Sequence, residues 1–317
     1  MNDLWNSAQI EKKISLNFKH DSTLRLALIH SSYAKLIEEP EINNQRLEYL
    51  GETILDLAIA DYIFYNFSHF QVGKLKALRE KLMDTERLTK LWYDLDLGEN
   101  YPFIALKEER HRLRVKNRNP FEQAFKALVG AIYIDRGFSQ TRNWLQKHLI
   151  LPLLKKYLKP ELECDPSPKQ IEFLGDALFT GIVIDYLYRN ILHASPKTLK
   201  SLAKKLSSKE SQTNYVRQIP DNALLELIAE EKKSKSCKTL LAKVYLQLES
   251  ENSKSSFPKT ASFLQSNCFD DDEIMEQAIN LLLKDGKPQK WIISNVMGYP
   301  SKKYNEGRDK FNELLGR

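Results

Sequence analysis

The stretch LEYLGETIL at residues 47–55 decides how the chain folds, and IEFLGDALF at residues 171–179 repeats its pattern. No proline occurs between Leu47 and Phe67, and apolar residues recur every three or four positions, which predicts an α-helix. In each stretch a Leu-Gly pair stands between two acidic residues four positions apart, so both acids share one helical face. A glycine inside a helix costs about 1 kcal/mol relative to alanine. Each glycine therefore indicates a crossing where a second helix backbone comes close. The four acidic residues are Glu48, Glu52, Glu172 and Asp176.

The composition is that of a helical globular protein. Hydrophobic residues make up 42% and charged residues 28% of the chain, as in ordinary globular domains, and eleven glycines are few enough to favour helix. Three cysteines, without paired spacing, argue against a disulfide framework or a cysteine metal site. The start of the chain has no apolar signal core, and the most apolar segment is short and interrupted by Asp185. We therefore expect a cytoplasmic protein without a membrane partner.

The chain contains an internal repeat. At an offset of 124 positions the sequence aligns with itself without a gap from Glu48 to Leu82, and KLKALREKL (74–82) meets TLKSLAKKL (198–206). At an offset of 112, FKALVGAIYID (125–135) meets CKTLLAKVYLQ (237–247). Self-similarity at a fixed offset indicates repeated structural units. We interpret the chain as two copies of one helical domain, the second shortened before its last motif.

Prolines mark the boundary between the two copies. The segment YLKPELECDPSPKQ (157–170) contains three prolines, which interrupt helices. We predict a first domain over residues 1–158, a second domain over residues 159–285 and a tail over residues 286–317. Within the tail, NEGRDKFNELL is expected to form one helix.

These motifs resemble those of the ribonuclease III family. The helix typical of that family has the form Glu-Phe-Leu-Gly-Asp, which EFLGD (172–176) matches and EYLGE (48–52) matches with substitutions. The first copy also carries ALIHSSYAK, LREKLMDTERL and FKALVGAIYID in the order of the family. The resemblance implies an all-α fold of two ribonuclease III-type helical domains that form an intramolecular pseudo-dimer. We expect the two signature helices to cross at Gly51 and Gly175. The resemblance also implies a structural role for His30.

The resemblance further implies a metal site that this sequence does not complete. The family holds magnesium, or manganese in its place, with two carboxylates from the signature helix and two from a later helix of pattern Asp-x-x-Glu. The first pair falls on Glu48 and Glu52, and in the second copy on Glu172 and Asp176. The later pair falls on residues that are not acidic: Gln123, Lys126, Lys235 and Lys238.

Lysine carries three hydrogen-bond donors and no acceptor, so it cannot bind magnesium while charged. We expect the lysines to pair with the acids instead, Lys126 with Glu48 or Glu52 and Lys238 with Glu172 or Asp176. Glu122 lies one step from Gln123, a rotation of about 100°, and is expected to be a poor substitute ligand. Asp56 continues the acidic stripe of the first helix and is expected to be solvated.

A basic segment, KEERHRLRVKNR (107–118), is the candidate RNA-binding surface. The net charge of +6 and pI of about 8.9 favour a polyanionic partner only mildly, and such a segment is more often a solvated face. Together with the resemblance to proteins that act on duplex RNA, the segment predicts binding to phosphates. The candidate residues are Arg110, Arg112, Arg114, Lys116 and Arg118.

Three functions are compatible with these patterns. The first is a double-stranded-RNA-binding protein, catalytically impaired and without a cofactor, that acts in RNA processing or as a ribonucleoprotein scaffold, with a ribonucleoprotein or homo-oligomeric partner. The alternative is an active endoribonuclease that cleaves double-stranded RNA with magnesium or manganese. The third is a protein-interaction module that no longer binds RNA.

Overall fold

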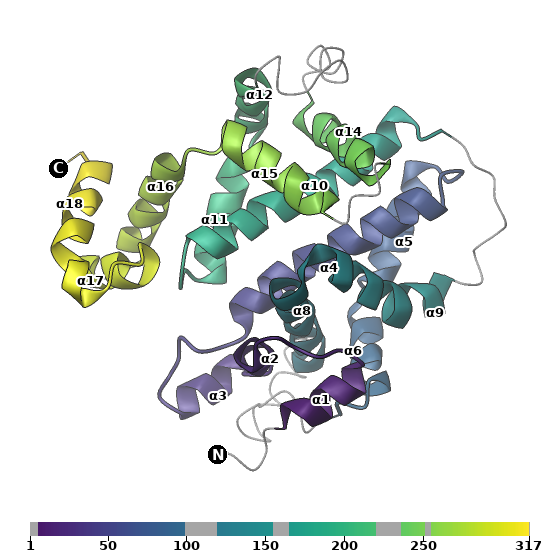
Figure 1. Cartoon of the computed structure of the whole chain (residues 1–317), viewed down its shortest axis with the longest axis horizontal. Helices are drawn as coiled ribbons and strands as arrows, with labels where there is room; N and C mark the ends of the chain where they lie inside the picture. The colour runs from purple at the N-terminus through teal and green to yellow at the C-terminus, as the bar shows by residue number, and fades with distance from the viewer. Residues whose placement is uncertain (1–5, 99–118, 155–164, 220–235, 251–254, 317) are drawn as a thin grey trace. The chain divides into compact units, whose positions relative to one another are not determined.

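The computed structural model describes residues 6–98, 119–154, 165–219, 236–250 and 255–316 (Figure 1). The regular elements in these ranges are helices, and the ranges contain no strand, which confirms the predicted all-α class. The chain forms two compact units, Met1–Ala177 and Leu178–Arg317. The division lies inside one helix, later than the expected boundary after residue 158, and residues 286–317 belong to the second unit. None of the helices in the described ranges is long and apolar enough to cross a membrane.

The first unit is built around two long helices, α4 and α8, with shorter helices packed on them. Helices α2 and α6 pack on α8, and α5 packs on α4. The apolar residues of α4, among them Leu50, Ile54 and Leu57, are fully buried. The elements of this unit are α1 (Ser7–Ile14), α2 (Asp21–Ala27), α3 (Ser31–Leu36), α4 (Gln45–Asn66), α5 (Val72–Leu82), α6 (Thr85–Asp94), α8 (Pro120–Leu145), η2 (Gln146–Ile150), α9 (Leu151–Leu154) and the first half of α10 (Pro168–Asn190).

The predicted close approach at Gly51 is present, and its partner is α8. A Cβ added at Gly51 would lie 1.8 Å from the carbonyl oxygen of Lys126, and one added at Gly130 would lie 2.3 Å from that of Leu47. Only glycine fits at both positions, because real Cβ atoms do not come within 3.0 Å of backbone atoms. The helix backbone that comes close at Gly51 is therefore that of α8, and the expected crossing of the two signature helices near Gly51 and Gly175 stays a prediction. The crossing with α8 sets the positions of all side chains on the facing sides of α4 and α8.

Helix α8 has clear local signals at its start and at a kink. The side chain of Asn119 caps it by accepting a hydrogen bond from the Phe121 N–H at 3.0 Å, and Pro120 occupies the first turn, where its missing N–H costs nothing. Gly137 interrupts the helix with φ of 77° and ψ of 173°. After this kink, the indole of Trp144 donates to the carbonyl oxygen of Ile14 at 2.8 Å, which ties the N-terminal helix to the core.

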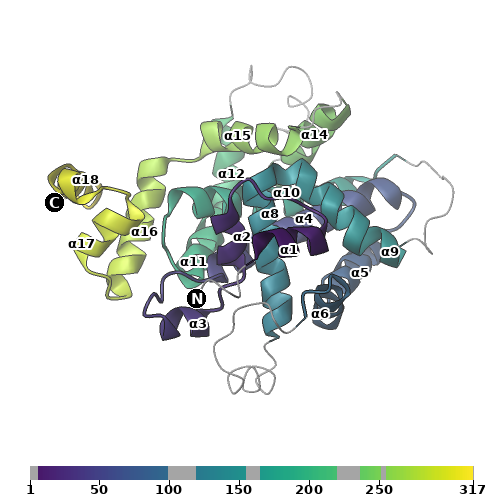
Figure 2. The same ribbon diagram turned by 60° about the horizontal axis from the view of Figure 1, so that its bottom comes forward.

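The second unit contains smaller helices (Figure 2). Helix α15 packs on α12 and α14, α16 packs on α11 and α18, and α18 also packs on η4. The predicted helix in the tail is confirmed by α18. The elements after α10 are α11 (Pro196–Leu206), α12 (Lys209–Gln218), α14 (Cys237–Ser250), α15 (Ser256–Cys268), α16 (Asp271–Lys284), α17 (Gln289–Trp291), η4 (Ile292–Val296), η5 (Ser301–Lys303) and α18 (Tyr304–Leu314).

Helix boundaries follow the offset of the sequence repeat. Both α11 and α12 begin and end 124 positions after α5 and α6, and α10 ends 124 positions after α4. The caps of α6 and α12 correspond as well: Asp84 accepts from the third residue of α6, and Ser208 accepts from the third residue of α12. At the ends of α4 and α10, Asn66 and Asn190 donate to the carbonyl oxygens four residues earlier, at 2.8 and 2.9 Å.

Candidate functional site

One face of α4 carries three acidic residues at four-residue spacing, Glu48, Glu52 and Asp56. Residues four apart are neighbours on a helix surface, so the three carboxylates follow one stripe. Glu48 is half-buried, the side chain of Glu52 is 45% exposed, and that of Asp56 is 21% exposed. The crossing at Gly51 brings α8 against the same part of α4. Glu52, at the centre of the stripe, therefore lies within reach of side chains of α8.

Lys126 of α8 lies between two carboxylates of this site. Its Nζ is 2.7 Å from Glu52 Oε1 and also forms an ion pair with Glu122 one turn earlier on α8. The side chain of Lys126 is only 12% exposed. The predicted ion pair of Lys126 with Glu52 is confirmed. An ammonium group thus occupies the space between α4 and α8.

The structure brings Glu122 to the site, while its expected weakness as a substitute metal ligand stays a prediction. Glu122 is 8% exposed, and it reaches the site through Lys126, which lies four residues later on the same face of α8. The rotation of about 100° separates Glu122 from Gln123, but it does not separate Glu122 from Lys126. Gln123 is half-buried on α8. Three charged groups from two helices therefore form one cluster, which we call the Lys126 cluster: Glu52, Glu122 and Lys126.

The electrostatics of the Lys126 cluster favour the charged lysine. Burial lowers the pKa of Lys126, but the hydrogen bonds and negative charges of Glu122 and Glu52 outweigh burial, and the net pKa is raised. Burial, with a smaller contribution from the charge of Glu52, also raises the pKa of the nearby Tyr49 hydroxyl to about 12. At neutral pH the cluster holds one ammonium against two carboxylates beside a neutral phenol.

Asp56 forms an ion pair with Arg79, so the expectation that Asp56 is solvated is wrong. Its Oδ1 lies 2.7 Å from Nε of Arg79, which α5 supplies. The guanidinium of Arg79 also lies over the ring of Phe173, 5.4 Å from its centroid. The pKa of Asp56 is raised to about 6, and burial is the largest cause. The charge of Arg79 opposes this rise, and the charges of Asp176 and Glu52 add to it. The sequence placed Asp56 on the acidic stripe through its spacing of four residues from Glu52, but it did not indicate Arg79 as the partner.

The first turns of α10 are held within the first unit. The side-chain amide of Gln170 donates to the carbonyl oxygens of Ser68 and Phe70 at 2.7 and 3.0 Å. Along these turns Glu172 is exposed and Asp176 is half-buried. The structure thus places Asp176 close enough to influence Asp56, an arrangement that the spacing within each copy did not predict.

Several predicted site residues are not tested by the structure. Lys238 lies in the first turn of α14 and is half-buried, and its pairing with Glu172 or Asp176 stays a prediction. Lys235 lies outside the described residues. So do the five candidate RNA-binding residues, Arg110, Arg112, Arg114, Lys116 and Arg118.

His30 has the structural role that was expected. It precedes α3, and its Nδ1 accepts a hydrogen bond from the N–H of Ser32 at 3.2 Å. A side chain that caps the first turn of a helix satisfies an N–H that has no partner within the helix. This cap is consistent with the start of α3 at Ser31.

Comparison with known proteins matches residues 20–153 to the Ribonuclease-III-like family. Residues 20–153 of the chain belong to the ribonuclease III family. Ribonuclease 3 of Nitratiruptor sp. is 36% identical over 157 residues, which are 50% of this chain and 64% of the relative. Ribonuclease 3 of Clostridium tetani is 29% identical over 68% of this chain and 88% of the relative. The chain spans 60–65% of the length of the first three curated relatives that it matches.

The solved structures that are similar to this ribonuclease III-family chain include the nuclease domain of ribonuclease III from Campylobacter jejuni. One such structure is 29% identical, covers 46% of this chain and 99% of its own, and has a TM-score of 0.38. Another is 27% identical, covers 51% of this chain and 100% of its own, and has a TM-score of 0.39.

The magnesium that the ribonuclease III family uses does not fit the residues present in the Lys126 cluster. An ammonium group about 4 Å from a divalent cation is repelled by roughly 8 kcal/mol at an effective dielectric constant near 20. Lys126 has no acceptor to offer a metal, and it already pairs with Glu52, one of the carboxylates that would bind one. Among the described residues, no three histidine, cysteine or acidic side chains are grouped so that they could hold a metal ion.

Proposed function

We propose that this ribonuclease III-family chain is a double-stranded-RNA-binding protein with impaired catalysis. It acts in RNA processing or as a scaffold in a ribonucleoprotein. The observation that carries the proposal is the position of Lys126, whose Nζ lies 2.7 Å from Glu52 and also pairs with the buried Glu122. The lysine stands where the resemblance expects a metal-binding glutamate, and its charge takes the place of the cation.

We further propose that the two copies form an intramolecular pseudo-dimer that receives duplex RNA. The coincidence of helix boundaries supports two copies, because α5 and α6 reappear as α11 and α12 at the offset of the sequence repeat. The matching caps at Asp84 and Ser208 support them independently. Duplex RNA is recognised mostly through its shape, phosphates and 2′-hydroxyls, so a charged surface without base-reading side chains is sufficient for this role.

The second candidate function is an active magnesium- or manganese-dependent endoribonuclease. It is favoured by the similarity to proteins called Ribonuclease 3 and by the acidic residues that the site retains, Glu48, Glu52 and Glu122. In this function a partner subunit would have to supply the carboxylates that the later helix lacks. The two candidates differ in what the purified chain does to duplex RNA.

The test is incubation of the purified chain with labelled duplex RNA, with magnesium and with manganese. We expect retention of the RNA in a filter-binding or gel-shift assay and no nicked product. A variant with Glu52→Ala and Glu48→Ala is the control for contaminating nuclease. Nicking by the wild type that is lost in this variant would establish the endoribonuclease instead, and absence of RNA retention would remove both functions.

RNA binding itself is tested by its dependence on salt. Each lysine or arginine that contacts a phosphate releases counterions, so several contacts produce a steep decrease of affinity with salt. The triple variant of Arg112, Arg114 and Lys116 to alanine should reduce the slope by about two. Removal of the same charge from the tail, at exposed Lys302, Lys303 and Arg308, is the control and should leave the slope unchanged. The reverse result would place the RNA-binding surface on the tail.

A further inference from the structure

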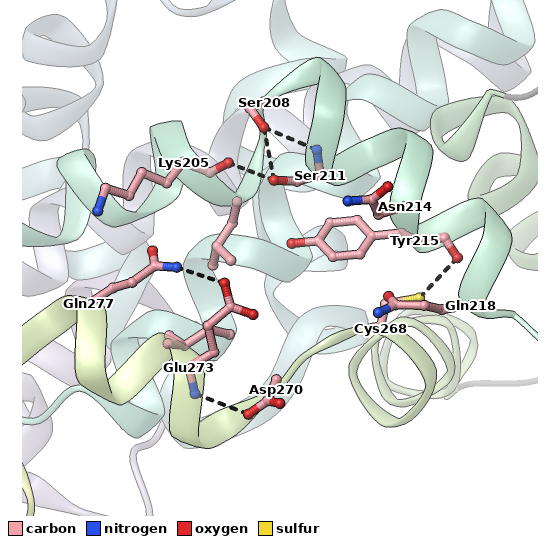
Figure 3. Close-up of a pocket in the computed structure, with 12 residues that line it drawn as sticks. Lys205, Ser208, Ser211, Asn214, Tyr215, Gln218, Cys268, Asp270, Glu273 and Gln277 are labelled. Atoms are coloured by element: carbon pink, nitrogen blue, oxygen red, sulfur yellow. Dashed lines mark hydrogen bonds between the residues drawn. The ribbon is translucent and has the colours of Figure 1, made fainter. Parts of the chain in front are cut away.

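The second unit contains a pocket of about 380 Å³ (Figure 3). Its walls come from the end of α11, one face of α12 and the first turns of α16. On α12 the lining residues Ser211, Asn214, Tyr215 and Gln218 recur every three or four positions, so a single helical face borders the pocket. The pocket does not involve the Lys126 cluster or its counterpart in the second copy.

The wall supplied by α16 has an excess of hydrogen-bond acceptors. The carboxylate of Glu273 accepts a hydrogen bond from the amide Nε2 of Gln277 at 3.0 Å. The other end of that amide, Oε1 of Gln277, is buried and has no donor among the residues that the structure describes. Asp270 caps the helix through the N–H of Glu273 at 3.0 Å. A buried acceptor without a donor is unfavourable, so this wall favours a ligand rich in donors.

The opposite wall presents an aromatic ring. Tyr215 is 6% exposed and is held between Phe179 and Phe269, with ring centroids 6.4 and 5.7 Å away. Figure 3 shows its hydroxyl directed toward the side of the pocket that carries Glu273 and Gln277. Burial raises the pKa of this hydroxyl, and the charge of Glu273 raises it further, so the phenol remains neutral. The oxygen of a neutral phenol hydroxyl can accept a hydrogen bond from a cationic donor.

The charges around the pocket are unfavourable for a phosphate group. Four consecutive acidic residues, Asp270 to Glu273, begin α16. Lys205 is the one basic residue that lines the pocket in the described part of the chain. Figure 3 shows its side chain extending away from Tyr215, along the rim of the pocket. The occupant is therefore a cation rather than a nucleotide.

We propose that the pocket between α12 and α16 binds the guanidinium group of an arginine side chain from a partner protein. A guanidinium group is planar and presents five donors in a fixed fork, which matches a carboxylate beside a buried amide oxygen. It can also donate to the hydroxyl oxygen of Tyr215, which is directed toward the same side of the pocket. An ammonium group has three donors around a point and satisfies this arrangement less well. The site provides a docking point for a protein partner in the second unit, outside residues 20–153.

The experiment titrates N-acetyl-arginine amide into the full-length chain, with binding measured by calorimetry or by NMR shifts. We expect saturable binding with a dissociation constant on the order of one millimolar, because the probe is small. N-acetyl-citrulline amide has the same shape without the charge and should not bind. N-acetyl-lysine amide should bind more weakly than the arginine probe.

Two matched variants on α16 locate the site. Glu273→Gln removes the charge at the pocket and should weaken binding of the arginine probe about ten-fold or more, because charge-assisted hydrogen bonds are the strong ones. Glu276→Gln makes the same change on the same helix outside the pocket lining and should leave the affinity unchanged. Thermal melting of both variants checks that each is folded.

Three results would overturn the proposal. The first is the absence of saturable binding to the folded wild type. The second is equal affinity for the arginine and citrulline probes. The third is equal weakening by the two variants, which would indicate a general effect of charge. Tighter binding of guanosine than of the arginine probe, lost in Tyr215→Ala but kept in Glu273→Gln, would assign the pocket to a nucleobase and would likewise overturn it.

Discussion

Helices α4 to α6 and α10 to α12 are the two halves of the sequence repeat, and they differ in the polar contacts around them. In the first half of the repeat, Asp61 is 3% exposed and pairs with Arg142 of α8 at 3.1 Å. At the aligned position, Asp185 pairs with Arg189 of its own helix at 2.8 Å. The pair of Asp56 and Arg79 aligns with Thr180 and Ala203, which cannot form an ion pair. Asp61 thus pairs with another helix and Asp185 with its own, and the inter-helix pair of Asp56 and Arg79 has no equivalent at the aligned positions.

The same difference holds at the helix crossing. Gly130, which meets the backbone of α4, aligns at the offset of 112 with Ala242, and Glu122 of the Lys126 cluster aligns with Ser234. The close approach and the second carboxylate around the lysine are therefore features of the first copy. A helix end needs only its own residues, whereas a crossing or a charge cluster needs two helices to stay matched. The second copy retains the helix ends, whereas Gly130 of the crossing and Glu122 of the charge cluster are replaced.

The largest effect is expected for Gly130→Ala. The new Cβ would lie 2.3 Å from the carbonyl oxygen of Leu47, so α4 and α8 would have to separate. We expect the free energy of unfolding to fall by about 4 kcal/mol or more, measured by urea denaturation. Ala242→Gly makes the reverse change in the second copy and should cost about 1 kcal/mol through helix propensity. Gly73→Ala, where the Cβ meets nothing within 4 Å, is the neutral control. Similar losses for Gly130→Ala and Gly73→Ala would contradict the observed crossing.

Lys126→Met is expected to have the next largest effect. The variant leaves Glu122, which is buried, and Glu52 without a cation, so the free energy of unfolding should fall by about 2–3 kcal/mol at pH 8. Without the cation the two carboxylates raise each other's pKa, so the loss should shrink as pH falls and protons replace the missing charge. Lys238→Met is the matched change in the second copy and should cost less, because serine replaces the second carboxylate there. A loss that does not depend on pH would indicate that packing, not charge, is what Lys126 supplies.

The double variant Gln123→Asp with Lys126→Glu tests whether the lysine replaces a metal. It restores acids at both later-helix positions and should be less stable than the wild type without magnesium. Magnesium that binds only the folded state should then raise the free energy of unfolding by about 2 kcal/mol or more at a hundredfold excess over its dissociation constant. The wild type is expected to show no such increase in thermal melting. A wild type that melts higher with magnesium would refute the cation replacement.

Spacing along the sequence predicted the helices and the pair of Lys126 with Glu52, because both depend on residues at known positions on a helix. It did not predict the role of Glu122, because the comparison with Gln123 concealed its relation to Lys126 one turn later. It also did not predict the pair of Asp56 with Arg79, since that pair depends on how α5 packs on α4. At Gly51 the sequence indicated a close helix backbone but did not identify α8 as that helix, because the sequence does not show which helices cross.

The smallest effect is expected for Asp56→Asn, and it depends on pH. The pKa of Asp56 is about 6 in the folded chain and 3.8 without perturbation, so ionisation of this carboxyl costs the folded state free energy. Its contribution to stability is fully present below about pH 3.8 and is lost as pH rises through about 6. A neutral asparagine avoids this cost. The variant should therefore match the wild type near pH 4 and exceed it by about 1–2 kcal/mol at pH 8, after allowance for the partial exposure of the side chain.

A second substitution connects this prediction to the other half of the repeat. The charge of Asp176 raises the pKa of Asp56, so Asp176→Asn should move the midpoint of the pH dependence to lower pH. Arg79→Gln should move it to higher pH, because the guanidinium of Arg79 lowers the same pKa. Glu80→Gln, an exposed neighbour on α5, is the control for a change of charge without contact. Shifts of opposite sign in the first two variants would show that the two signature helices share one electrostatic site even where their own ion pairs differ. Equal midpoints of the pH dependence in Asp176→Asn, Arg79→Gln and Glu80→Gln would refute this shared site, because neither Asp176 nor Arg79 would then act on Asp56.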